Sequence, residues 1–161
     1  MNIIKKTILL LSILIVSSTV FSQEQSVYGN QSEKNSIYGT IGFNPGEFYI
    51  PLCLNFERNI YDVGFAEFNG RTGIGFWLDW TEKGIDFPIT GQIVFFKKSS
   101  HIEIGIGAQY IYDFADNMTG LSHLLNLAYR FQKPKGKFLF KIGIEKNKWT
   151  VYPFISTGYA F

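Results

Sequence analysis

The chain has 161 residues, which is enough for one domain rather than two. Aromatic residues make up 17% of the chain and charged residues only 17%, against roughly 25% charged residues in an average soluble domain. No run of like charge occurs, so no nucleic-acid-binding surface is predicted, and the single cysteine, Cys53, excludes an internal disulfide framework.

The first 22 residues have the order of a secretory signal peptide. Lys5 and Lys6 form a basic start, an apolar stretch follows from Ile8 to Val16, and small residues lead to a predicted cleavage site after Ser22. The alternative is a transmembrane anchor, but nine residues fall well short of the ~20 that a spanning helix needs. The signal holds two of the 15 basic residues and none of the 13 acidic ones, so the mature chain would be formally neutral.

Residues 23–35 are polar and aperiodic, which predicts a flexible periplasmic leader. From Ser36 onward apolar residues alternate with small or polar residues at a period of two, the pattern of strands with two different faces. Turn signals divide this part into eight predicted strands: 36–43, 49–58, 65–80, 87–96, 101–112, 121–131, 138–145 and 149–161.

An even number of strands joined by short hairpins is typical of an up-and-down closed barrel. An open sheet of this aromatic content would expose a long unpaired edge and invite aggregation. The sequence therefore predicts an all-β domain over residues 36–161, an eight-stranded antiparallel up-and-down barrel preceded by a cleavable signal peptide.

The chemistry of the two strand faces indicates the surroundings of the barrel. One face is almost purely Ile, Leu, Phe and Tyr, whereas the other combines glycines with charged residues. Glycine at alternate positions would only weaken the outside of a soluble barrel, but it suits the narrow interior of an eight-stranded one. A transmembrane β-barrel with a polar interior is therefore predicted, and aromatic residues near the strand ends, Tyr49 among them, are expected to supply interfacial girdles.

The polar face contains three acidic and three basic residues that can neutralise one another inside the barrel. They are Glu57, Arg71, Glu103, Arg130, Lys141 and Glu145. We predict that they close the lumen as ion pairs. A conducting pathway is the alternative, although porins with open water channels use 16 or more strands.

The chain resembles the small bacterial outer membrane protein beta-barrel (porin-like) families, which share the eight-stranded OmpA-type and OmpX-type architecture. The stretches that carry this resemblance are LNFER (54–58), RTGIG (71–75), HIEIGIGAQY (101–110), LAYRFQKPKGKFLFKIGI (127–144) and STGYAF (156–161). The resemblance also implies an assembly signal in the last strand. Phe161, Tyr159 and Ile155 match this signal, which the barrel-assembly machinery would read. Thr157 is less apolar than the residue that the pattern has at this position.

Some barrels of this architecture are lipid A-modifying enzymes, and such catalysis needs a nucleophile, a base and a carboxylate within hydrogen-bond reach. Ser122 and His123 are adjacent on a strand and should face opposite sides. Ser99, His101 and Glu103 share a face, but strand rise separates successive members by about 6.6–6.8 Å. No catalytic set is predicted.

Metal ligands are equally sparse. Two separated histidines and one cysteine give no zinc spacing. Asp113, Asp116 and Asn117 could touch a divalent cation, but the calcium-loop pattern is absent. No metal and no cofactor is predicted.

These observations predict a non-enzymatic protein of a bacterial outer membrane, with a structural or narrow-pore (porin-like) role. The alternatives are a lipid A-modifying enzyme and a secreted, soluble, lipocalin-like barrel. Outer-membrane lipids and the barrel-assembly machinery are the expected partners of a monomer that binds no nucleic acid. Loops 44–48, 81–86, 113–120 and 146–148 should face outside, and turns near 61–64, 97–100 and 132–137 the periplasm.

Overall fold

The structure is a computed structural model, and it describes residues 34–63, 65–95, 99–133 and 136–161. The predicted signal peptide and almost all of the predicted leader lie outside the described residues. Residues Ser32–Phe161 form one compact unit. Among the described residues, no helix is long and apolar enough to cross a membrane.

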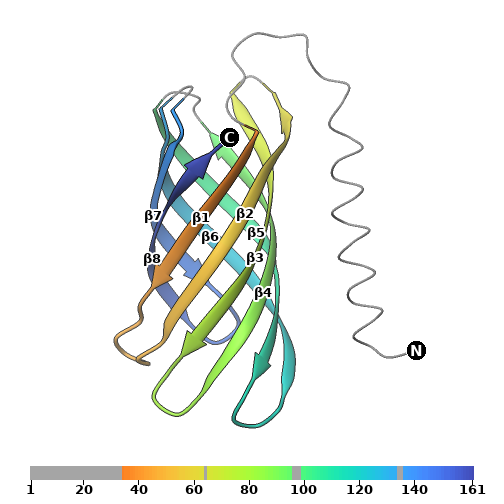
Figure 1. The fold of residues 1–161 in the computed structure, drawn as a ribbon, viewed down its shortest axis with the longest axis vertical. Helices are drawn as coiled ribbons and strands as arrows, with labels where there is room; N and C mark the ends of the chain where they lie inside the picture. The colour runs from red at the N-terminus through yellow and green to blue at the C-terminus, as the bar shows by residue number, and fades with distance from the viewer. Residues whose placement is uncertain (1–33, 64, 96–98, 134–135) are drawn as a thin grey trace, which may run out of the picture. The chain divides into compact units, whose positions relative to one another are not determined.

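The described unit consists of eight antiparallel strands that close into a barrel (Figure 1). In chain order the strands are β1 (Asn35–Gly42), β2 (Ile50–Asp62), β3 (Ala66–Leu78), β4 (Lys83–Phe95), β5 (Ser100–Asp113), β6 (Thr119–Phe131), β7 (Phe138–Lys146) and β8 (Val151–Ala160). Each strand pairs with the next one along the chain, which confirms the predicted all-β, up-and-down barrel.

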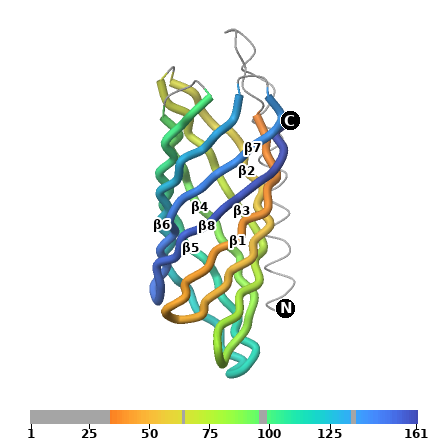
Figure 2. The backbone as a smooth tube through the Cα atoms, turned by 90° about the vertical axis from the view of Figure 1, so that its left-hand side faces the viewer, coloured from red at the N-terminus to blue at the C-terminus, as the bar shows by residue number. Residues whose placement is uncertain are grey.

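The barrel closes because β1 pairs with β8, and the two strands lie side by side in Figure 2. Ile37 lies opposite Tyr159, and Ile41 lies opposite Ile155. Beyond the last ladder pair, the Asn35 N–H donates to the Phe161 carbonyl at 2.9 Å, and the Phe161 N–H donates to the Asn35 carbonyl at 2.8 Å. The final residue of the chain is therefore tied into the seam rather than left to fray.

The two ends of the barrel are defined by their connections. The terminal rim holds Asn35, Phe161 and the β2–β3, β4–β5 and β6–β7 connections, whereas the loop rim holds the β1–β2, β3–β4, β5–β6 and β7–β8 connections.

Side chains alternate between the outside and the inside of the barrel, as strand geometry requires, except where the register of β2 against β3 shifts between Asn59 and Tyr61. The outward positions are mostly large, apolar and exposed, among them Ile37, Ile41, Leu52, Leu54, Phe56, Ile74, Phe76, Ile89, Ile102, Ile104, Ile106, Leu125, Leu127, Ile142, Ile144 and Ile155. The inward positions are largely polar and buried, among them Asn55, Glu57, Asn69, Arg71, Asp86, Thr90, Gln92, Glu103, Gln109, Ser122, Asn126, Arg130, Lys141, Glu145 and Ser156.

Inward glycines make room for large side chains on the neighbouring strand. Gly158 lies directly opposite Tyr38 in the β1–β8 register. A Cβ atom added at Gly158 would stand 2.5 Å from the Tyr38 Cα, a separation that real Cβ atoms essentially never show. Gly105, opposite Asn126, likewise has no room for a Cβ atom beside the Asn126 amide. The glycines of the polar face are therefore needed to fit long polar side chains into a narrow lumen.

Two expectations from the sequence need correction. The loop predicted over 81–86 is shorter: Thr81 and Glu82 lie between strands, but β4 begins at Lys83, because its first four residues pair with Gly75–Leu78 of β3. Tyr49 does not belong to an outer girdle. It is half-buried at the loop rim, where its ring lies 5.4 Å from Tyr152 and 6.1 Å from Trp77.

Candidate functional site

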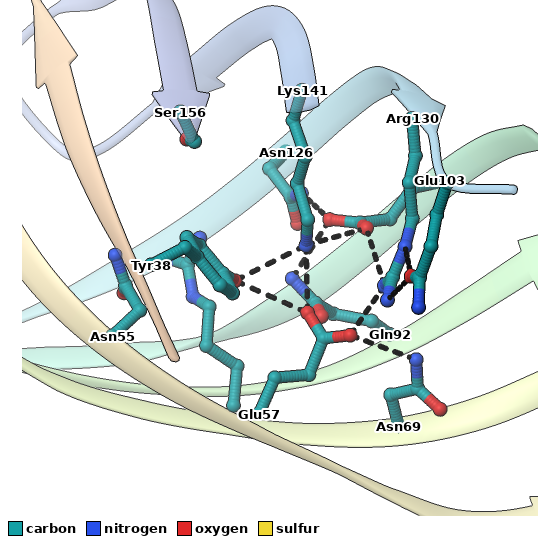
Figure 3. A network of polar contacts seen from close by, with 12 residues as sticks. Tyr38, Asn55, Glu57, Asn69, Gln92, Glu103, Asn126, Arg130, Lys141 and Ser156 are labelled. Carbon is teal, nitrogen blue, oxygen red and sulfur yellow. Dashed lines mark hydrogen bonds and ion pairs between the residues drawn. The ribbon is translucent and has the colours of Figure 1, made fainter. Parts of the chain in front are cut away.

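The structure places all six predicted lumen residues inside the barrel, where each is at most 7% exposed. They do not form one cluster. Glu57, Glu103, Arg130 and Lys141 form an ion quartet nearer the terminal rim (Figure 3), whereas Arg71 and Glu145 pair with each other elsewhere.

Lys141 lies at the centre of the ion quartet. Its Nζ donates to Glu57 Oε2 at 2.6 Å and lies 2.7 Å from Glu103 Oε2, so one ammonium group bridges two carboxylates. The same Nζ donates to the Tyr38 hydroxyl at 3.2 Å, and that hydroxyl donates to Glu57 at 3.1 Å. The ammonium therefore uses its donors on fixed acceptors, which is what a desolvated lysine requires.

Arg130 is the second cation of the ion quartet. Its Nη1 pairs with Glu57 Oε1 and lies 3.5 Å from Glu103 Oε2. Its Nε and Nη2 donate to the side-chain oxygen of Gln132 at 3.1 and 2.7 Å. The guanidinium is thus held by partners on both sides.

Neutral amides complete the ion quartet. Asn69 Nδ2 donates to Glu57 Oε1 at 3.0 Å, and Gln92 and Asn126 donate to Glu103 Oε1 at 3.0 and 3.1 Å. Two acids and two bases cancel in charge, and the amides occupy carboxylate lone pairs that the cations leave open. This full pairing is the condition under which charges can be buried without a prohibitive desolvation cost.

The second polar group lies nearer the loop rim and contains a residue that the sequence prediction missed. Arg71 Nη2 donates to Glu145 Oε2 at 2.9 Å, and the Tyr152 hydroxyl donates to Glu145 Oε1 at 2.5 Å. Asp86, which was expected in a loop, points inward from β4 and is buried beside them. Asp86 and Gln92 are separated by an even number of positions on the same strand, so their side chains face the same side. This spacing was the signal that could have placed Asp86 inside the barrel.

Apolar side chains fill the ends of the interior. Leu139, Val94 and Ala160 are buried near the terminal rim, and Trp77 and Leu124 are buried toward the loop rim. Between these ends the ion quartet and the Arg71–Glu145 pair place paired charges across the interior.

Members of the candidate catalytic sets have other partners or face opposite sides of the wall. Glu103 is occupied by Lys141, Arg130 and two amides, and His101 Nε2 instead lies 3.4 Å from the Gln132 carbonyl. Ser122 is buried and the adjacent His123 is exposed, so the two face opposite sides of the wall as expected.

Three carboxylates gather at the loop rim, where a cation-touching loop was considered. Oxygen atoms of Glu82, Asp113 and Asp116 lie within 4.8 Å of one another, and exposed acidic groups of this kind are common without an ion. The Asp113 carboxylate raises the pKa of Glu82 above its ordinary value. Asn117 is engaged separately, because it accepts a hydrogen bond from the Tyr112 hydroxyl at 2.8 Å.

The residues of the predicted assembly signal all lie on the outer surface of β8 and its end. Ile155, Tyr159 and Phe161 are each 48% exposed. The Lys137 ammonium lies 5.5 Å from the centre of the Tyr159 ring, a cation–π arrangement at the terminal rim. A row of accessible apolar side chains therefore runs along the last strand.

No protein-family model matches the chain, and no curated protein sequence matches it either. Two solved structures resemble its fold. One, described as "De novo design of transmembrane beta-barrels", is 11% identical, with a TM-score of 0.47 over 81% of this chain and 96% of that chain. The other, "Solution NMR structure of de novo designed TMB2.3", is 11% identical with a TM-score of 0.47, over 83% of this chain and 97% of that chain. The resemblance to OmpA-type and OmpX-type families stays a prediction.

Replacing Lys141 with Met should destabilise the barrel by about 3–5 kcal/mol, because Glu57 and Glu103 would then face each other with one cation fewer. Chemical unfolding from detergent micelles, followed by tryptophan fluorescence, measures this change. The matched control is Lys146→Met on the same strand, because Lys146 is exposed and should change stability by no more than about 0.5 kcal/mol. Equal effects of both variants would contradict a role for the ion quartet in stability.

Proposed function

We propose that this chain is a non-enzymatic, monomeric β-barrel of a bacterial outer membrane, with a closed interior and a structural role. The observation that carries the proposal is the inverted polarity of the barrel: paired charges are buried inside, and large apolar side chains are exposed outside. Water-soluble barrels have the opposite arrangement, whereas membrane barrels have this one.

The outer surface supports the membrane location. On β5 alone, Ile102, Ile104 and Ile106 are exposed in succession, and their outward neighbours on β6, Leu125 and Leu127, are exposed as well. Soluble monomers rarely expose apolar patches larger than a few hundred Å². Hydrocarbon is the surrounding in which such a continuous belt is stable, and a closed barrel leaves no backbone edge unpaired within it.

The packed interior supports a structural role over a narrow pore. The ion quartet spans from β2 to β5, β6 and β7, so it crosses the lumen rather than lining its wall. An ion on its way through would have to displace buried, fully paired charges. The engagement of Glu103 in the ion quartet also supports the absence of catalysis.

The membrane location predicts a penalty for charge on the belt. Ile106 faces outward near the middle of β5 and is 68% exposed. Replacing Ile106 with Arg should make the free energy of folding into a bilayer less favourable by about 2–4 kcal/mol. Folding titrations into phosphatidylcholine vesicles measure this penalty.

The control for this variant is Met118→Arg, since Met118 is 62% exposed but lies in the loop between β5 and β6. It should cost no more than about 1 kcal/mol. A secreted soluble barrel would give the reverse result: Ile106→Arg would be tolerated, and the mature chain would stay in solution without detergent.

The closed interior predicts an electrically silent protein. Purified chain in planar lipid bilayers should give no steady conductance above that of the bare bilayer, because the ion quartet and the Arg71–Glu145 pair lie across the lumen. A wide-channel porin of 16 strands, reconstituted in the same way, is the positive control. Steady, ion-selective conductance by this chain would overturn the structural role in favour of the narrow-pore alternative.

We propose further that the barrel-assembly machinery reads Ile155, Tyr159 and Phe161, with both chain ends on the periplasmic side. Phe161→Ala keeps the backbone bonds to Asn35 and removes only the ring. We expect a several-fold loss of the chain from the outer-membrane fraction of cells, with unchanged spontaneous folding into vesicles.

Phe138→Ala is the matched control for the assembly signal. Phe138 is also an outward, exposed aromatic residue at the terminal rim, and it lies directly opposite Tyr159. Its replacement should leave the membrane fraction at the level of the unaltered chain. If both variants assemble equally well, the assembly-signal proposal is wrong.

A further inference from the structure

The interior contains a small cavity beside the Arg71–Glu145 pair, and this cavity is named the chamber. Its volume is about 20 Å³, and Arg71, Asp86, Gln109, Glu145, Tyr152 and Asn55 are among the residues that line it. On this measure a buried water molecule needs about 10–15 Å³. The chamber therefore has room for one water-sized ligand and for nothing much larger.

Three side chains of the chamber have buried polar atoms with no hydrogen-bond partner among the described residues. These atoms are Arg71 Nε, Asp86 Oδ1 and Gln109 Nε2. The side chains come from β3, β4 and β5, and none is more than 7% exposed. Left without partners, such buried atoms would each carry a desolvation cost.

Asp86 reaches the chamber because its cross-strand neighbour is Gly75. A Cβ atom added at Gly75 would overlap the Asp86 carboxylate and would also stand 3.3 Å from the Leu52 carbonyl oxygen. The missing side chain at position 75 thus lets the carboxylate lie against β3. The site is built by a specific pair of residues and is not a packing defect between them.

We propose that the chamber binds one ordered water molecule. The water accepts hydrogen bonds from Arg71 Nε and Gln109 Nε2 and donates one to Asp86 Oδ1. A water molecule buried in a protein makes about three hydrogen bonds, as both donor and acceptor. The three unpartnered atoms match that requirement, with two donors and one acceptor.

The charges around the chamber disfavour an ion as its occupant. A metal cation would meet the Arg71 guanidinium and the N–H groups that point into the chamber. An anion would meet the carboxylates of Asp86 and Glu145. A neutral molecule that both donates and accepts is compatible with all of these groups, and it also solvates Asp86, which has no ion-pair partner within salt-bridge distance among the described residues.

This inference goes beyond the proposed structural role and does not depend on the membrane location, because the chamber is bounded by inward-facing residues. It distinguishes an ion quartet whose charged groups contact one another directly from a second polar group whose side chains are joined through water. Loss of a single polar atom is expected to break a direct contact in the ion quartet and a contact through water in the second group.

The experiment is water–protein NMR on isotope-labelled chain in detergent micelles. We expect cross-peaks from water to Arg71 Hε and to the Gln109 side-chain amide protons, with the sign of a long-lived bound water. If these protons are assigned and show no such cross-peak, the proposal is overturned.

Asp86→Leu removes the acceptor and fills the space, so the cross-peak at Arg71 Hε should disappear. The matched control is Thr90→Val on the same strand, since Thr90 Oγ1 is also buried and unpartnered, yet Thr90 does not line the chamber. The control should keep the cross-peak. Loss of the signal in Thr90→Val but not in Asp86→Leu would overturn the assignment.

A measurement on the unaltered chain keeps the proposal testable if Asp86→Leu fails to fold. The ¹³Cγ chemical shift of Asp86 should stay constant between low and high sodium chloride when water is the ligand. A saturable change of this shift with sodium would identify a cation in the chamber and overturn the water assignment.

Discussion

The ion quartet of Glu57, Glu103, Arg130 and Lys141 is the interaction on which the rest of the structure depends. Charges buried in a narrow barrel are tolerable only when they are fully paired, and here two cations each contact both carboxylates. Because the partners come from β2, β5, β6 and β7, the ion quartet connects opposite walls of the barrel. It therefore couples the stagger of distant strands, which local turns cannot do.

The glycines of the inner face follow from the same constraint. A lumen of eight strands has little spare volume, so a long polar side chain on one strand needs an empty position on the next. Gly158 beside Tyr38, Gly105 beside Asn126 and Gly75 beside Asp86 each supply that space. What looks like weak strand-forming sequence is thus part of interior packing.

The outer face is governed by a different requirement. Its aliphatic residues are exposed along the described strands, so their choice is explained by the surroundings proposed for the barrel rather than by its core. The only clustered apolar core among the described residues is small, with Ala128, Tyr152 and Phe154 packed beside Tyr49. Hydrogen bonding around a closed sheet and paired charges inside it take the place that a large hydrophobic core has in soluble proteins.

Local periodicity determined much of this protein from its sequence: the all-β class, the strand number, the closed order, and the inward or outward direction of residues such as Glu103 and Ile104. It failed at Asp86, where glycine and charged residues resembled a loop although they continue β4. Periodicity also could not show that Arg71 and Glu145 separate from the ion quartet. Alternation indicates whether a side chain points into or out of the barrel. The position along the barrel axis at which that side chain meets its partners depends on how each strand is staggered against the next. That stagger is set only when β8 closes on β1, so the tertiary structure alone decided which charges pair and where the chamber lies.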